Sequence, residues 1–180
     1  MILSTDILWK LSIKTGSAGN SLAQADPNAA LGKFISTTQW AGGVLHDLFD
    51  VVSGDDNAAG RVDYRCVFIH NNHATLPLLT PVVWLESEVA NGAVTAIGVD
   101  PAAQSVIAQG SAQAAEIADE LSVPAGVTFS APVTKGTGIS LGASLDAGKC
   151  RAIWIRRTAQ NNTALDNDGA TIRVEGDTAQ

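Results

Sequence analysis

Large aromatic side chains are scarce in this chain of 180 residues. Phe, Trp and Tyr make up 5% of the residues, although 46% are hydrophobic, and charged residues reach only 16%. A single domain of this length buries roughly 70% of the surface that its unfolded chain exposes. The core must therefore be built mainly from Val, Ile, Leu and Ala, with few rings.

Other absences exclude several classes of protein. The net charge of −7 leaves no basic footprint for nucleic acid. The chain lacks a continuous apolar run of about 18 residues, so no transmembrane helix is expected. Its first residues lack the basic and apolar regions of a signal peptide. The two cysteines, Cys66 and Cys150, cannot form a disulfide framework, and we expect two free thiols.

The pattern that is present is that of many short strands. Residues 62–70 and 150–158 alternate between two faces, as β-strands do, and residues 7–13 alternate similarly, with a short amphipathic helix as the alternative there. Shorter strand candidates cover residues 34–38, 82–89, 93–99, 127–129, 138–141 and 170–174. Turns rich in Gly, Pro, Asn and Asp separate them, which predicts an all-β fold, either a β-sandwich or a β-barrel.

Two pairings follow from local signals. Asn91-Gly92 between strand-like runs is typical of a hairpin, so residues 82–90 are expected to pair with 93–99. The last two strand candidates, 150–158 and 170–174, are also expected to pair antiparallel.

Two segments leave helix and strand open. In residues 44–52, Leu45, Leu48, Phe49 and Val52 would share one helical face. Residues 104–121 are rich in alanine and are the main helix candidate, but Gly110-Ser111 interrupts them. Two short strands flanking a loop are an equal alternative for that segment.

The first quarter of the chain is predicted to be an arm. Residues 15–32 are small, polar and rich in turn formers, so they contribute little core. We therefore divide the chain into an extended N-terminal arm, residues 1–45, and a β-sandwich domain, residues 46–180.

Signals for catalysis or metal binding are weak. Cys66, His70 and His73 are close in sequence, but no third ligand or orienting group is indicated, which favours a buried thiol and loop histidines. Asp166-Asn167-Asp168-Gly169 matches the start of a calcium loop without its distal Glu, which favours a plain loop. We expect no catalytic residue, no metal and no cofactor.

Six residues are candidates for contacts with a partner. Arginine and tryptophan are enriched at protein interfaces, and three arginines concentrate positive charge in one predicted strand of an acidic chain. The tryptophans and the phenylalanine lie in the predicted arm, where a large ring needs a surface to bury against. The candidate interface residues are Trp9, Phe34, Trp40, Arg151, Arg156 and Arg157.

Several blocks of sequence resemble virion structural proteins of tailed bacteriophages. The blocks are residues 62–76 (VDYRCVFIHNNHATL), 124–130 (PAGVTFS), 145–158 (LDAGKCRAIWIRRT), 15–20 (TGSAGN) and 173–178 (RVEGDT). The resemblance runs over nearly the whole chain, and its motifs describe strands and turns rather than a chemical site. It implies a component of a phage particle with a β-sandwich fold.

The leading hypothesis from this resemblance is a non-enzymatic capsid decoration (cement) protein, with an antiparallel β-sandwich of jelly-roll type and an extended N-terminal arm. Such a protein would bind and stabilise the assembled head as a dimer or trimer, with the major capsid protein or other virion proteins as partners, and without nucleic acid or membrane. Its location would be the virion, assembled in the host cytoplasm. The alternatives are a tail or head–tail connector protein, a carbohydrate-binding virion module and, least favoured, a hydrolytic enzyme using Cys66, His70 and His73.

Overall fold

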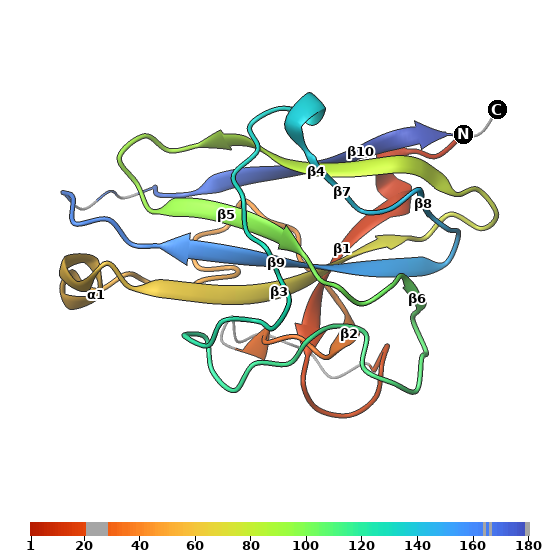
Figure 1. Cartoon of the computed structure of the whole chain (residues 1–180), viewed down its shortest axis with the longest axis horizontal. Helices are drawn as coiled ribbons and strands as arrows, with labels where there is room; N and C mark the ends of the chain where they lie inside the picture. The colour runs from red at the N-terminus through yellow and green to blue at the C-terminus, as the bar shows by residue number, and fades with distance from the viewer. Residues whose placement is uncertain (21–28, 164, 166, 179–180) are drawn as a thin grey trace.

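The computed structural model describes residues 1–20, 29–163, 165 and 167–178, and these form two antiparallel β-sheets with very little helix. The sheets lie face to face along their length (Figure 1). The all-β sandwich predicted from the sequence is confirmed. The described part holds no helix long and apolar enough to cross a membrane.

The larger sheet has six strands and is built around one long pair. β3 (Val62–Asn71) and β9 (Lys149–Thr158) pair antiparallel from Val62 opposite Thr158 to His70 opposite Cys150. These are the two clearest strands of the sequence. The other strands are β1 (Ile7–Ile13) beside β3, β2 (Phe34–Gln39) beside β1, and β5 (Val94–Val99) and β6 (Ser105–Val106) beside β9.

The smaller sheet has four strands and is organised by β4 (Leu78–Glu88). β10 (Ala170–Thr178) pairs with β4 along one side. Two short strands, β7 (Ile139–Ser140) and β8 (Ser144–Leu145), pair with its other side.

The space between the sheets holds the main core. Val67 and Ile69 of β3, and Ile153 and Ile155 of β9, point toward the smaller sheet and are at most 2% exposed. They meet residues of β4 such as Leu85. Branched aliphatic side chains thus fill the interior, as the scarcity of aromatics requires.

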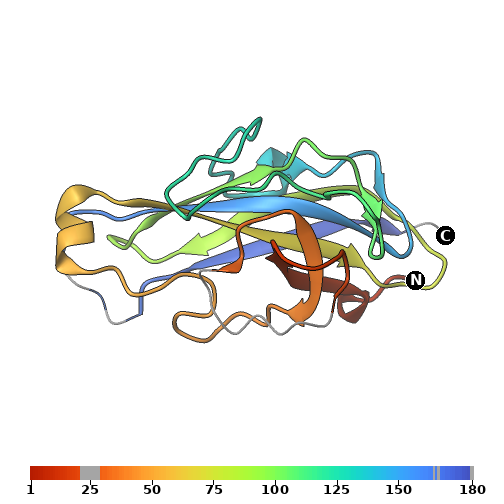
Figure 2. The same cartoon turned by 90° about the horizontal axis from the view of Figure 1, so that it is seen from below.

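The opposite face of the β3–β9 pair is buried as well. Cys66 and Phe68 of β3 and Trp154 of β9 are fully buried there, together with Ile35 of β2 and Ile117. The cover comes largely from the segment of residues 100–130, which runs along one flank of the strands in green to cyan (Figure 2). The alternation in the sequence therefore separates two cores, not a core from solvent.

Both expected strand pairings are wrong. β4 and β5 flank the Asn91-Gly92 turn but belong to different sheets, and β9 and β10 also belong to different sheets. The turn crosses from one sheet to the other, with Asn91 alone at positive φ (63°). Local turn residues specify a change of direction, whereas the partner of each strand is set by which face it must bury.

The predicted arm does not stand apart from the sandwich. β1 and β2 lie within it, with β1 hydrogen-bonded between β2 and β3. Ile13 and Ile35 are 3% and 0% exposed, because they fill part of the core. Of the predicted arm, residues 21–28 lie outside the described residues.

The two ambiguous segments are not helical. Residues 44–52 form bends and turns, and residues 104–121 hold only the short strand β6 and one isolated bridge between Gly32 and Glu116, closer to the strand–loop–strand alternative. Residues 127–129 form no strand, although the next residue, Ser130, bridges Ile97.

Three short helices complete the described elements. The sequence indicated a turn where α1 (Gly54–Ala59) begins, and Ser53 caps this helix by accepting from the Asp56 N–H. The other two are 3-10 turns, η1 (Ser4–Asp6) and η3 (Lys135–Thr137).

A single buried carboxylate anchors the long segment that covers the larger sheet. Asp100 is 1% exposed and accepts hydrogen bonds from the Ala102 N–H (2.9 Å), the Ala115 N–H (2.9 Å) and Trp154 Nε1 (2.8 Å). It thereby ties both ends of the segment 102–115 to a fully buried ring of β9.

We predict that Asp100→Ala lowers the free energy of unfolding by about 3 kcal/mol or more, because it leaves the buried Trp154 N–H unpaired and releases two backbone donors. Urea denaturation followed by tryptophan fluorescence measures this. Asp55→Ala, at an exposed carboxylate, is the control and should change stability by less than about 0.5 kcal/mol. Equal stability of the two variants would contradict the anchoring role.

Candidate functional site

A groove of about 960 Å³ opens at one end of the sandwich. Its walls are the loop of residues 40–54, the β4–β5 turn and the segment from the end of β9 to the start of β10. The β4–β5 turn, α1 and the β9–β10 connection gather at that end, opposite the end where Met1 lies (Figure 1).

Apolar side chains are exposed around this groove. Val44, Leu45 and Val51 of the first wall are 69%, 54% and 66% exposed, and Val89 and Leu165 of the other walls are 39% and 42% exposed. Isolated exposed aliphatic residues are ordinary, but several that line one groove mark a surface suited to a partner.

Three aromatic rings line the same groove. Trp9 of β1 and Trp40 meet edge to face, with ring centroids 5.8 Å apart, and Trp40 Nε1 donates to Asp47 at 2.8 Å. Phe49 lies against two guanidinium groups, those of Arg157 (4.7 Å to the ring centroid) and Arg65 (5.3 Å). Cation–π contacts of this kind hold the loop against the sheet.

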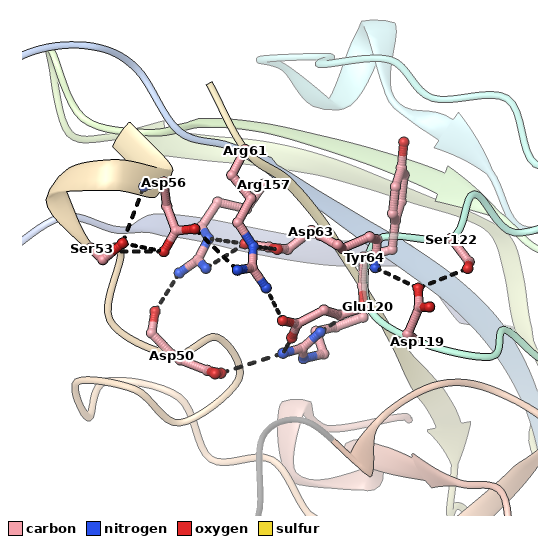
Figure 3. A network of polar contacts seen from close by, with 12 residues as sticks. Asp50, Ser53, Asp56, Arg61, Asp63, Tyr64, Asp119, Glu120, Ser122 and Arg157 are labelled. Atoms are coloured by element: carbon pink, nitrogen blue, oxygen red, sulfur yellow. Dashed lines mark hydrogen bonds and ion pairs between the residues drawn. The ribbon is translucent and has the colours of Figure 1, made fainter. Parts of the chain in front are cut away.

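A network of ion pairs lies between this loop and the strands of the larger sheet (Figure 3). Asp63 accepts from Arg61 Nε at 2.7 Å and from Arg157 Nη2 at 2.5 Å. Glu120, from the covering segment, binds both Arg61 and Arg65. The network thus joins β3, β9 and the segment over the outer face of the larger sheet.

The same network reaches the backbone of the groove loop. Arg157 Nη1 donates to the carbonyl oxygen of Asp50 at 2.5 Å, and Arg65 Nε donates to that of Leu48 at 3.1 Å. Arg61 also binds Asp56 of α1 at 3.0 Å, and its carboxylate partners hold the pKa of the Arg61 guanidinium above its usual range. Hydrogen bonds from Ser53 and then Arg61 lower the pKa of Asp56.

Burial makes the network sensitive to the loss of one member. The side chain of Arg65 is 0% exposed and that of Asp63 is 2% exposed, so both charges have left water. Removing one partner of a buried pair leaves an uncompensated charge, which costs about 3–5 kcal/mol.

We predict that Asp63→Asn destabilises the protein by about 3 kcal/mol or more and loosens the groove loop, since Arg61 and Arg157 lose their shared carboxylate. Thermal denaturation measures the first effect, and amide hydrogen exchange over residues 41–53 measures the second. Asp55→Asn removes a nearby exposed charge and should leave both unchanged. Unchanged stability of Asp63→Asn would contradict this account.

The structure divides the six candidate interface residues. Trp9, Trp40 and Arg157 line the groove together. Phe34 is instead buried with Ile13 and Ala18. The remaining two, Arg151 and Arg156, lie elsewhere on β9, outside the groove.

Arg156 and Arg151 are held by neighbours within the chain. Arg156 lies over the ring of Phe129 at 5.4 Å, and Arg151 Nη2 donates to the Asp100 carbonyl at 3.2 Å. Burial lowers the pKa of the Arg151 guanidinium. Contacts within the chain therefore account for the positions of both side chains.

Sequence reasoning missed Phe49, Arg65 and Glu120 as parts of the site. The sequence showed that the apolar residues of 44–52 could share a helical face. It did not show that several of them are exposed to solvent. Arg65 was visible only as part of an alternating strand, and nothing in the sequence connects it with Glu120, which lies 55 positions away.

The histidine and cysteine candidates do not form one site. Both nitrogens of buried His70 lack a hydrogen-bond partner in the described part of the chain. His73 Nδ1 instead accepts from the N–H groups of Thr75 (3.1 Å) and Leu76 (3.0 Å). Within the described ranges, no three His, Cys, Asp or Glu side chains are grouped so that they could hold a metal ion.

The two thiols are free and separated along the sheet. Cys66 lies opposite Trp154 and Cys150 lies opposite His70, an offset of four residues or about 13 Å, beyond the reach of a disulfide. Burial raises the pKa of Cys66 well above its usual range and that of Cys150 to about 11. Both thiols therefore stay protonated and unreactive near neutral pH.

In the calcium-loop candidate, residues 166–169, the carboxylate of Asp168 binds a backbone N–H group. Asp168 accepts from the Ala93 N–H at 2.7 Å and so fastens the β9–β10 connection to the β4–β5 turn. A Cβ at Gly92 would lie 1.9 Å from an oxygen of this carboxylate, so a larger residue there would displace the Asp168 side chain. Asp166 lies outside the described residues.

Buried His70 predicts a loss of stability in acid. Desolvation, together with the nearby charge of Lys10, lowers its pKa from 6.5 to about 4. As the pH falls below 6.5 the unfolded chain takes up the proton first, so the free energy of unfolding should fall by about 3 kcal/mol by pH 4 from this group.

Urea denaturation between pH 7 and pH 4 tests this, and His70→Leu should remove that part of the pH dependence. His46→Asn is the matched control, because His46 is an exposed histidine at positive φ (63°), a conformation that Asn tolerates. An identical pH profile for His70→Leu and the natural protein would show that the argument is wrong.

Comparisons with known proteins add no relative: no family model, no curated protein and no solved structure matches this chain.

Proposed function

We propose that this protein is a structural component of a tailed-phage virion, most specifically a decoration protein that binds and stabilises the assembled head. The sequence blocks that resemble such proteins support the proposal, and so does a β-sandwich with a groove whose rim exposes apolar side chains. In this role the protein would act by binding and not as an enzyme. The two sheets of the described sandwich have six and four strands. That this sandwich is of the jelly-roll type stays a prediction.

The observation that carries the proposal is the groove with its exposed apolar rim. Its described lining is also acidic, because it includes four carboxylates, those of Asp47, Asp50, Glu88 and Asp168, and among the described residues one guanidinium, that of Arg157. A partner segment that combines apolar side chains with Lys or Arg complements it in both shape and charge. We propose such a segment of the major capsid protein as the occupant.

A carbohydrate-binding module is the second candidate. The pair of Trp9 and Trp40 in the groove favours it, because sugar rings stack on partly exposed aromatic rings. A tail or head–tail connector protein would use the same groove with a different virion partner.

We predict that the double variant Leu45→Asp/Val51→Asp loses capsid binding at least tenfold, because it places two charges on the apolar rim. Co-sedimentation with undecorated phage heads measures binding. Val123→Asp/Val133→Asp is the matched control, since these side chains are 64% and 68% exposed and lie outside the groove. It should bind as the natural protein does.

Three results distinguish the candidates. Binding to heads that the groove variant abolishes supports the decoration role. Labelling of tails or of the connector in electron micrographs, with bare heads, favours the connector alternative. Binding to an array of glycans that depends on Trp40, without binding to phage particles, favours the carbohydrate module and overturns the structural role.

A further inference from the structure

The outer edge of β10 is open along the whole strand. β10 pairs with β4 on one side, from Ala170 opposite Glu88 to Thr178 opposite Leu78. In the described part of the chain, its backbone forms no hydrogen bond to any segment on its other side. In this nine-residue strand, alternate residues therefore direct their backbone N–H and C=O groups to the open side, where no described segment pairs with them.

The other long edges of the two sheets are covered by loops. The edge of β2 is bridged through Gly19 N–H to Ile35 O (2.7 Å), and that of β5 through Ser130, which exchanges two hydrogen bonds with Ile97. The far side of β4 is covered by β7, by β8 and by a hydrogen bond from Leu85 N–H to Pro132 O. An exposed edge strand is a template for pairing with another chain, so proteins usually block it.

We propose that β10 pairs antiparallel with β10 of a second copy of this chain, which joins the two smaller sheets into one continuous sheet. The occupant is a second copy because the strand is complementary to itself. Its outward residues read Thr171, Arg173, Glu175 and Asp177, while Ile172 and Val174 pack against the core between the sheets.

Charge selects the register of this pairing. In a continuous sheet, directly opposed residues share a face, so the twofold axis must pass through a residue position. An axis at Arg173 opposes two arginines, and an axis at Glu175 opposes two glutamates. An axis at Val174 places Arg173 opposite Glu175 of the other copy, twice, and avoids like charges.

The charged residues of β10 are free enough to make these contacts. Within one chain Arg173 binds Glu86 at 3.0 Å, and Lys135 binds Glu175 at 3.3 Å. All four side chains are between 38% and 50% exposed, and exposed pairs of this kind contribute less than about 1 kcal/mol each. Re-pairing across the dimer therefore costs little.

The dimer is a separate property from capsid binding. Thr171 and Ile172 also line the groove, so the C-terminal end of β10 of the second copy would lie beside the groove rim. The proposed dimer depends only on the open edge of β10 and on the charges along it. Its formation can be measured on the isolated protein without any virion.

Charge reversal gives a test that separates this interface from effects within one chain. The full-length protein should form a dimer in analytical ultracentrifugation. Arg173→Glu or Glu175→Arg alone should weaken it about tenfold or more, because each variant opposes like charges twice. A 1:1 mixture of the two variants should restore the dimer as a heterodimer, since each strand then faces its opposite charges.

Lys149→Glu and Glu116→Arg are the matched controls, because they reverse exposed charges outside β10 and should leave the dimer unchanged. Circular dichroism and thermal denaturation establish that each variant is folded, and the mixture of variants remains informative even if one is less stable. A natural protein that stays monomeric at high micromolar concentration overturns the proposal. So does a dimer that neither single variant weakens, or one that the mixture fails to restore.

Discussion

The pairing of β3 with β9, buried on both faces, is the constraint on which the rest of this structure depends. A strand pair with two apolar faces needs two covers. The smaller sheet provides one, and the segment of residues 100–130, anchored through Asp100, provides the other. This arrangement explains how 180 residues with few aromatics still form two cores.

The polar network follows from the same constraint. β1 pairs with β3 only from Val67 to Asn71. Nearer the start of β3, loop carbonyl oxygens accept from its free edge instead, and the Tyr64 N–H donates to the carbonyl oxygen of Glu120 at 2.8 Å. This contact brings a carboxylate from the covering segment beside the arginines of β3. Arg65 and Arg157 then bind the backbone of the loop whose apolar side chains line the groove. The position of the proposed contact surface therefore depends on this network of ion pairs.

Much of the fold could be predicted from the sequence, because alternation over residues 62–70 and 150–158 is a local property. The pairings predicted around Asn91-Gly92 and between the last two strands failed because both turns lead from one sheet to the other. Of the site, Trp9, Trp40 and Arg157 were identified as interface candidates and do meet in the groove. Phe34 did not join them, because β2 pairs with β1 there and its ring is buried against Ile13 and Ala18.

The sequence by itself determined the class of fold, the strands that carry it and the low content of charged residues. Only the tertiary structure decided which strands are neighbours, which thiols and histidines are buried, and which edge is left open. The physical reason is that alternation and turn residues act over a few positions. The contacts of Arg65 with Glu120 and the exposure of the β10 edge depend on segments that are far apart in the chain and meet only when it folds.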